Sequence, residues 1–509
     1  MEFQKIKLHR SEKNRAAVTQ ITLDDDYNVP DYRQDIVKVI KERGELRFDE
    51  VKAMEGAAWI KGSLVFKVLY RSDKQEGKIS CLRGEIPFQE RLNMDGLSEY
   101  DAVHATGDME DLTIGVINSR KLNVRAVIVL TASSEKEVDE ELTCELSDGS
   151  SYEQNIVEKE ALKLLVVRRD ICRQKSEAVL PSSKPNIREI LWQSMQLRNV
   201  ESRLVEGKIR LSGEILVSIL YNDEEEGEHL SWYETTVPLD AQAECGVMED
   251  DCIWQVQMVP LTMELEVKPD YDGEERILVM ELALDTHIRI WKEEKIRLLT
   301  DLYSLQKEVK PVFRECPLER LLVKNAAKCR MTEQMELKED KEKVLQICSC
   351  EGKVLLERQE IKPDGVLAEG TVEVNILYIT PDDHMPVGAV QEIYPFSQLV
   401  EIPEMSAQAK VELDASLEQL SAVMLDQEHV EIRAAVRLDL IAFVQEVIQN
   451  IEEATESEPD LEMLRNRPGL VGYIAKAGDD LWTIAKENHT TIQNLSLIHI
   501  SEPTRRVVI

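Results

Sequence analysis

The sequence predicts a mainly β fold with short helices, of the α+β class, built from three copies of one antiparallel-sheet module. A nine-residue phrase, Gly-x5-[Val/Ile]-Leu-Tyr, occurs at residues 62–70, 213–221 and 370–378, in steps of 151 and 157 residues. Apolar residues alternate with other residues inside each phrase, which is the period of a strand with one buried face. The 509 residues of the chain correspond to about three domains of roughly 150 residues. A phrase that recurs at domain-sized spacing indicates that one module was duplicated.

The repeated phrase carries one glycine, one leucine and one tyrosine per copy. These signature residues are Gly62, Leu69, Tyr70, Gly213, Leu220, Tyr221, Gly370, Leu377 and Tyr378. Each tyrosine falls on the apolar face of its strand, so we expect it in a domain core, with its hydroxyl group bonded to a polar partner. A ligand-contacting role for the tyrosines is the alternative. The opposite face is mixed in composition, which indicates a sheet that is covered on one side.

Further elements flank the phrase in every copy. An extended segment precedes it at 18–23, 176–180 and 332–337, and a long alternating strand follows it at 121–130, 276–284 and 430–438. A short helix is expected after Pro30 and Asp31 in the first copy and after Pro185 and Asn186 in the second. Proline suits the first helical turn, and Asp or Asn can cap it. The third copy has 338–342 at this place and no proline, so its connection is expected to differ.

These patterns divide the chain into seven segments. They are an N-terminal arm at 1–14, three modules at 15–170, 171–312 and 313–446, a linker at 447–470, a small module at 471–494 and a tail at 495–509. The linker is expected because its sequence is acidic, contains proline and is poor in apolar residues. The tail is interpreted as a read-through artefact, because its first eleven residues match the translation of a sequencing adapter. A genuine amphipathic tail is the alternative.

The small module predicts a short strand, a glycine turn at Gly478 and a helix. Asp480 can cap that helix, and Leu481, Ile484 and Ala485 follow at helical spacing. The run that begins at Tyr473, Tyr-Ile-Ala-Lys-Ala-Gly-Asp-Asp-Leu-Trp-Thr-Ile-Ala, resembles the opening of the LysM module.

The resemblance to LysM implies a partial β-α-α-β module. It also implies binding of N-acetylglucosamine-containing glycans or, as in some LysM proteins, binding of a protein partner. The candidate binding residues lie in the loop and at the helix start, and they are Lys476, Gly478, Asp479, Asp480 and Trp482.

The chain is strongly acidic, with a formal net charge of −35 at pH 7. It should repel nucleic-acid phosphates and anionic lipid headgroups, so we expect neither nucleic-acid binding nor direct membrane insertion. Solubility is one explanation of this acidity, and attraction to a basic partner is the other. The N-terminal residues lack the apolar core of a signal peptide, and no apolar run approaches the roughly 18 residues of a membrane helix. We therefore expect the protein to stay in the compartment where it is made.

The sequence carries little sign of chemistry. Its nine cysteines occur without a Cys-x-x-Cys pair, which is typical of reduced, mostly buried thiols. Cys348 and Cys350 could hold a metal, but buried thiols are the better interpretation. No phosphate-binding loop, nucleophile elbow or histidine pair of metal spacing occurs. We therefore expect no catalytic residues, no metal and no cofactor, and we interpret the chain as a non-enzyme.

The three phrases, with the proline pairs before two of them, resemble the SPOCS domain of spore coat proteins in endospore-forming Firmicutes. SPOCS domains followed by LysM resemble the family of SipL-like spore coat morphogenetic proteins, over residues 15–494. The resemblance implies a scaffold in the mother-cell cytoplasm, at the forespore surface and spore coat. It would bind the coat's basement-layer morphogenetic ATPase and other coat proteins and anchor the coat. A peptidoglycan-binding LysM protein of the spore or cell envelope is the alternative.

Overall fold

A computed structural model describes most of the backbone, and it describes the side chains of the same residues other than 12–15, 496–500 and 504–508. The described residues are 1–72, 78–147, 151–224, 229–337, 343–403, 405–406, 409–458, 471–476, 478–500 and 504–508.

Eighteen long strands form three repeats of six. Repeat 1 contains β1 (Phe3–Asn28), β2 (Ile36–Met54), β3 (Ala57–Ser72), β4 (Ile79–Asn93), β5 (Val103–Asn118) and β6 (Lys121–Leu146). Repeat 2 contains β7 (Glu153–Val179), β8 (Ile187–Val205), β9 (Lys208–Asp223), β10 (Leu230–Glu244), β11 (Ile253–Pro269) and β12 (Glu275–Tyr303). Repeat 3 contains β13 (Glu308–Glu336), β14 (Gln346–Lys362), β15 (Gly365–Ile379), β16 (Val387–Glu401), β17 (Lys410–Met424) and β18 (His429–Ser457).

Each repeat folds into two three-stranded antiparallel sheets around one hydrophobic core. In repeat 1 the strand orders are β1-β6-β5 and β2-β3-β4, and the other two repeats have the same topology. The signature phrases form the central strands β3, β9 and β15, as the alternation predicts. Tyr70, Tyr221 and Tyr378 are fully buried in the three cores. The hydroxyl groups of Tyr70 and Tyr221 each donate a hydrogen bond of 3.1 Å, to the carbonyl oxygens of Gln34 and Pro185.

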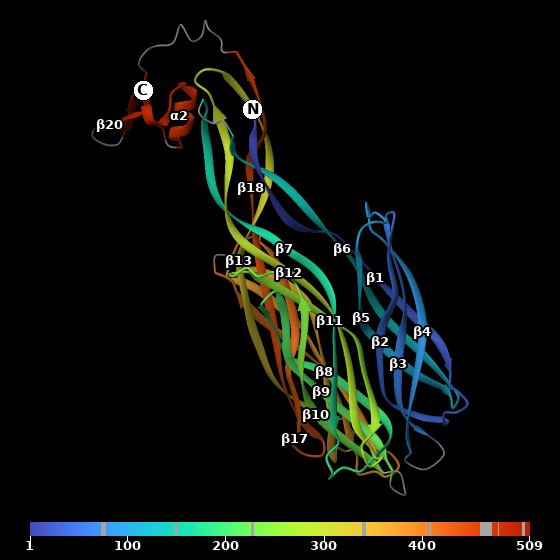
Figure 1. Cartoon of the computed structure of the whole chain (residues 1–509). Coiled ribbons are helices and arrows are strands. Elements are labelled where there is room, and N and C mark those ends of the chain that lie inside the picture. Colours follow the sequence, from blue (N-terminus) through green and yellow to red (C-terminus); the bar gives the residue numbers. More distant parts are fainter. Residues whose placement is uncertain are drawn as a thin grey trace.

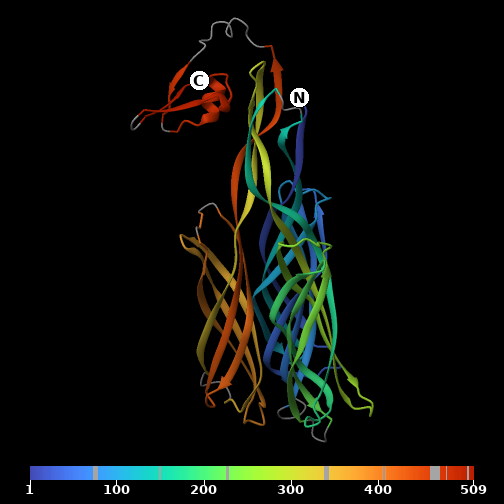
Figure 2. The same cartoon turned by 60° about the vertical axis from the view of Figure 1, so that its left-hand side comes forward.

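Figures 1 and 2 show the three sandwiches side by side at one end of the molecule. The first and last strands of each repeat are the longest, and they run on beyond the sandwiches toward the N-terminus. We call this extension the stalk; it comprises residues 3–10, 138–146, 153–164, 292–303, 308–321 and 444–457.

The stalk has a buried polar contact between all three repeats. Asn450 on β18 is 2% exposed. Its side-chain oxygen accepts a hydrogen bond from the Thr143 N–H at 2.8 Å. Its amide nitrogen donates to the carbonyl oxygens of Thr143 at 2.8 Å and Leu299 at 3.1 Å. A buried amide that is satisfied in only one alignment of the strands helps to set their register.

The predicted α+β class is wrong, because 79% of the described residues are in strands and 2% are in helices. No helix follows Pro30 or Pro185. Residues 30–33 form a tight turn, closed by a hydrogen bond of 2.9 Å from Arg33 N to Pro30 O, and the equivalent turn of repeat 2, closed at 2.9 Å from Lys184 N to Pro181 O, comes just before Pro185. They lead directly into β2 and β8. The helix pattern in the sequence is overridden by an arginine that lies far along the chain.

That arginine is Arg120 in repeat 1 and Arg276 in repeat 2. The Arg120 guanidinium donates to the carbonyl oxygens of Arg33 at 2.8 Å and Pro30 at 2.9 Å. Arg276 bonds to the carbonyl oxygens of the equivalent turn at 2.6 and 3.0 Å. These bonds satisfy turn carbonyls that a helix would have used internally. Glu428 occupies the same backbone position in repeat 3, and the connection 338–342 there lies outside the described residues.

The strands also correct the predicted boundaries. The limits at 170/171, 312/313 and 446/447 fall inside β7, β13 and β18, and the predicted arm 1–14 is mostly part of β1. The start of the linker at 447 is wrong, because β18 pairs with β13 as far as Ser457 opposite Glu308. Acidic residues are tolerated there because alternate side chains of a paired strand face solvent. The predicted linker residues 459–470 lie outside the described residues.

The C-terminal segment, residues 471–476, 478–500 and 504–508, differs from the predicted β-α-α-β module. It contains β19 (Gly472–Ile474), α2 (Leu481–Glu487), a 3-10 turn (Ile492–Asn494), β20 (Ser496–Ile500) and β21 (Thr504–Val508). A second α-helix is absent from these residues, and β19 and β20 both pair with β21. The side-chain amide nitrogen of Asn488 donates to Ile484 O at 2.8 Å, and His489 has a φ of 50°. The helix therefore ends at these residues.

Among the described residues, none of the helices combines the length and apolar character that crossing a membrane requires.

Candidate functional site

The signature leucines meet where the three repeats join. Leu69, Leu220 and Leu377 lie on the strand face opposite the tyrosines and are 0%, 2% and 1% exposed. They belong to one hydrophobic cluster, with Trp192 of repeat 2 and Cys348 of repeat 3 among its other members. The mixed face predicted from the sequence is therefore covered as well, by the other repeats. The sequence feature that could have predicted this contact is the leucine at the same position of this face in every copy.

A buried ion pair extends this junction, and we call the leucine cluster and the ion pair together the seam. Lys41 on β2 donates to Glu351 on β14 at 2.9 Å, and the Trp192 indole on β8 donates to the same oxygen at 3.1 Å. Arg43 bonds to the other Glu351 oxygen at 3.3 Å. Lys41 and Glu351 are 6% and 8% exposed, so one carboxylate joins strands of all three repeats away from water.

The charge of Glu351 is stabilised by its partners. Burial by itself raises the pKa of this carboxyl group, but the charges of Lys41 and Arg43 and the bonds from Lys41 and Trp192 hold the pKa below its usual value. Lys41 also lies 5.2 Å from the centre of the Trp192 ring, a cation–π distance. A satisfied, charged network of this kind favours one arrangement of the repeats over others.

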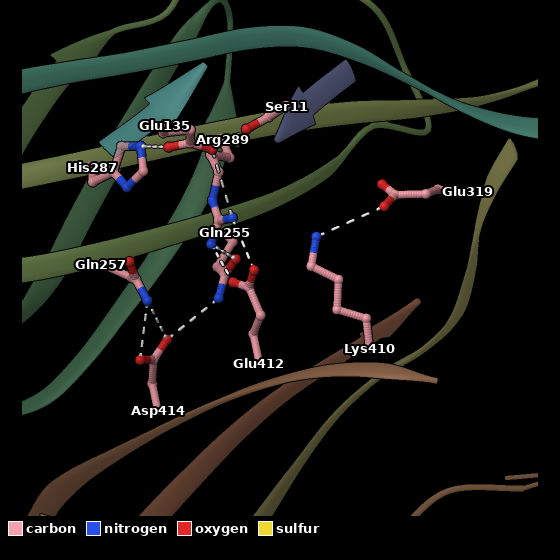
Figure 3. A network of polar contacts seen from close by, with 10 residues as sticks. All are labelled: Ser11, Glu135, Gln255, Gln257, His287, Arg289, Glu319, Lys410, Glu412 and Asp414. Carbon is pink, nitrogen blue, oxygen red and sulfur yellow. Dashed lines mark hydrogen bonds and ion pairs between the residues drawn. The ribbon is translucent and has the colours of Figure 1, made fainter. Parts of the chain in front are cut away.

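Figure 3 shows a second polar network between the repeats. Glu135 on β6 accepts a hydrogen bond from Ser11 and forms an ion pair with His287 on β12 at 3.1 Å. Arg289, two residues along β12, bonds to Glu412 of repeat 3 and to Gln255. The network thus continues from repeat 1 through repeat 2 to β17 of repeat 3.

Glu135 makes the stability of this network depend on pH. Burial raises the pKa of Glu135, but the bonds from His287 and Ser11 and the charge of Arg289 outweigh it and lower the pKa from 4.5 to about 2. A carboxyl group with a depressed folded-state pKa stabilises the fold above its unfolded pKa, and that contribution is lost as the pH falls through the folded value.

We therefore expect Glu135 to contribute about 2–3 kcal/mol of unfolding free energy that disappears between about pH 4.5 and pH 2. Urea unfolding at a series of pH values in this window measures the slope. Glu135→Gln should flatten it, while Glu137→Gln, at an exposed position of the same strand, should not. Equal slopes in all three proteins would contradict this assignment.

The described residues offer little for catalysis. They contain no group of three or more His, Cys, Asp or Glu side chains that could hold a metal ion. Cys348 and Cys350 are both buried, and this burial raises the pKa of each thiol to about 12. Such thiols stay protonated and unreactive at neutral pH, consistent with their interpretation as core residues.

Four of the predicted binding residues shape the loop before α2. The Asp479 carboxylate accepts bonds of 2.8 Å from the Tyr473 hydroxyl and from the Lys476 N–H. Asp480 is the N-cap of α2, as predicted, and accepts from Thr483 N at 2.8 Å. Gly478 has a φ of +98°, in the region that favours glycine, and a Cβ there would meet nothing within 4 Å. The two carboxylates thus hold the loop in shape.

Trp482, the fifth predicted residue, faces the stalk. Its indole nitrogen donates to Asp301 on β12 at 2.7 Å, and its ring lies 4.9 Å from that of Tyr303, edge to face. Lys486, one turn further along α2, bonds to both Asp301 oxygens at 2.6 and 2.7 Å. Asp301, Tyr303 and Lys486 were not predicted, because no local pattern links them to the C-terminal segment.

The fold and these contacts define a class: a three-repeat, all-β protein whose buried polar side chains join one repeat to another. Three segments of the chain, residues 35–117, 186–268 and 343–425, match the family model described as SipL, SPOCS domain. One match falls in each repeat, so the chain matches a SipL-like protein with SPOCS repeats. The SipL family comprises non-enzymatic sporulation proteins, so the chain is sporulation-related.

The other comparisons add no functional information. None of the curated proteins matches the chain. One solved structure, the ferric yersiniabactin uptake receptor FyuA from Yersinia pestis, aligns with 87% of this chain and 79% of that chain at 9% identity, with a TM-score of 0.10. A likeness at that TM-score carries no argument about fold or function.

Proposed function

We propose that this protein is a non-enzymatic adaptor in endospore coat assembly, acting in the mother-cell cytoplasm at the forespore surface. In this proposal it binds the coat's basement-layer morphogenetic ATPase and other coat proteins, and it anchors the coat. The observation that carries the proposal is the seam. Lys41, Trp192 and Glu351 come from three different repeats and are buried together.

The seam suits an adaptor because it makes one body of three repeats. A partner surface that spans two repeats is then formed before binding, and little conformational entropy is lost when the partner arrives. The net charge of −35 favours a partner with a basic face, since complementary charge raises the rate of encounter.

The predicted alternative was binding of peptidoglycan or another N-acetylglucosamine-containing glycan. Within the described part of the chain no contact favours it. Trp482, the aromatic side chain best suited to stack on a sugar, lies instead against Asp301 and Tyr303.

A pull-down of the purified coat ATPase by the purified chain tests the proposal. We expect specific retention that weakens as salt is raised, because salt screens exposed charges, while an unrelated protein of similar net charge retains none. Failure of the chain to bind the ATPase at any concentration up to about 100 μM, which corresponds to a binding free energy near −5.5 kcal/mol, would overturn the adaptor assignment. In a parallel sedimentation with purified peptidoglycan the chain should stay in the supernatant, and pelleting would favour the glycan alternative.

A further inference from the structure

We propose that the outer end of β12 is a docking site for the chain's own C-terminal segment, and that docking competes with partner binding by the loop before α2. The second part rests on the proposed function and on the further assumption that the loop, whose residues the LysM resemblance marks as binding candidates, contacts the coat ATPase. The first part rests on contacts alone. The site consists of Asp301 and Tyr303, and its ligand is a helix face that presents a tryptophan and a lysine four residues apart.

Asp301 provides the polar half of the docking site. The Asp301 side chain is 17% exposed, and its two oxygens accept three hydrogen bonds of 2.6 to 2.7 Å from Trp482 and Lys486. Residues at i and i+4 of a helix point to the same side, so Trp482 and Lys486 reach one carboxylate together. A charged acceptor with several donors at short distance is among the stronger polar contacts in proteins.

Tyr303 provides the apolar half. It is 5% exposed, and its ring meets the Trp482 ring at an interplanar angle of 63°. Its hydroxyl group donates to the carbonyl oxygen of Thr490 at 2.7 Å. Burial, followed by the nearby charges of Glu153 and Asp301, raises the pKa of Tyr303 to about 12. Both ends of the helical part of the segment are thus held.

The repeat architecture explains why there is one such site. A one-residue irregularity in the strand pairing marks equivalent places in β6, β12 and β18, after Thr143, Leu299 and Ile451. Counting from it, Asp301 corresponds to Glu145 and Glu453, so all three strand ends carry an acid. Tyr303 corresponds to Ser147 and Thr455, so repeat 2 alone pairs the acid with an aromatic ring.

Docking also explains why the short helix α2 is folded. The helix has seven residues, and isolated helices shorter than about 12–15 residues are marginal in water. Ile484 and Ala485 are its buried residues, and the contacts to the stalk supply the remaining support. When the segment leaves the stalk, the helix should fray and Trp482 should become accessible.

Hydrogen–deuterium exchange of the amides at 481–487 tests the docking site directly, without any partner. Asp301→Ala and Trp482→Phe should each raise exchange there by about tenfold or more, and Tyr303→Phe, which keeps the ring, by less. Glu453→Ala, at the equivalent acid of repeat 3, should leave it unchanged. Amides of β12 at 277–290 report whether the repeats stay folded. Unchanged exchange at 481–487 in both Asp301→Ala and Trp482→Phe would overturn the docking site.

The coat ATPase then separates docking from competition. If the docked form hides the loop, Asp301→Ala should bind the ATPase several-fold more tightly than the natural chain. The reason is that a larger fraction of the molecules has the loop free to bind. Weaker or equal binding, together with faster exchange, would overturn the competition but leave the docking site in place. If no variant binds the ATPase, the proposed function and the competition that rests on it both fail, and the exchange result still decides the docking site. Exchange rates that depend on protein concentration would assign the contact to a second copy and contradict intramolecular docking.

Discussion

Substitution of Glu351 by alanine is expected to lower the free energy of unfolding by about 3–5 kcal/mol, the usual cost of breaking a buried ion pair. The change removes the acceptor of Lys41, Arg43 and Trp192 and leaves the Lys41 ammonium, 6% exposed, without a counter-charge. Urea unfolding followed by circular dichroism measures the loss.

A matched control is available on the surface. Glu281 pairs with Lys175 at 2.8 Å, but the two side chains are 58% and 53% exposed. Glu281→Ala should therefore cost less than about 1 kcal/mol, as exposed pairs do. The double variant Lys41→Met/Glu351→Met should recover much of the stability lost in Glu351→Ala, since it removes both buried charges. Similar losses in Glu351→Ala and Glu281→Ala would show that the seam does not hold the repeats together.

The strands were predictable because their pattern is local. Alternation over a few residues placed Tyr70, Tyr221 and Tyr378 in three cores, and the structure buries all of them. The predicted helices failed for the opposite reason. Pro30 and Asp31 fit a helix start, but Arg120, about ninety positions later, binds the carbonyl groups of the turn, and such a partner leaves no trace in a local pattern.

The seam could be predicted only in part. A leucine at the same outward position of every copy was visible, and it marks the contact between repeats. Lys41 and Glu351 are 310 residues apart, and each is an ordinary charged residue in its own strand. The acid of this pair is in repeat 3 and the base is in repeat 1. The pair therefore depends on how the repeats pack, and no sequence pattern shared by the repeats predicts it.

The C-terminal loop shows a similar limit. Helical spacing predicted α2 and its cap at Asp480, since both depend on neighbouring residues. The orientation of Trp482 depends on Asp301 and Tyr303 in another domain. A tryptophan beside a turn was therefore interpreted as a free contact residue, although its indole is bonded to the stalk.

The signature glycine has a structural role that leads to the second large prediction. In each repeat it lies opposite an irregularity in the pairing of the adjacent strand, between Phe48 and Glu50, Arg198 and Glu201, or Leu356 and Arg358. A β-bulge bends the strand that carries it, and a carbonyl group of that strand comes close to the glycine. A Cβ at Gly370 would lie 2.2 Å from Leu355 O, and one at Gly62 would lie 2.4 Å from Arg47 O.

Gly370→Ala is therefore expected to lower the free energy of unfolding by about 2–3 kcal/mol, because a backbone carbonyl cannot move aside without shifting its strand. Gly62→Ala should cost nearly as much, and Gly213→Ala less, since its nearest carbonyl oxygen is 2.9 Å away. Gly115→Ala is the matched control: it lies in β5, and a Cβ there meets nothing within 4 Å. Urea unfolding of the four variants should rank them in this order. A loss in Gly115→Ala as large as that in Gly370→Ala would mean that strand flexibility, and not the close carbonyl, explains why glycine occupies the signature position.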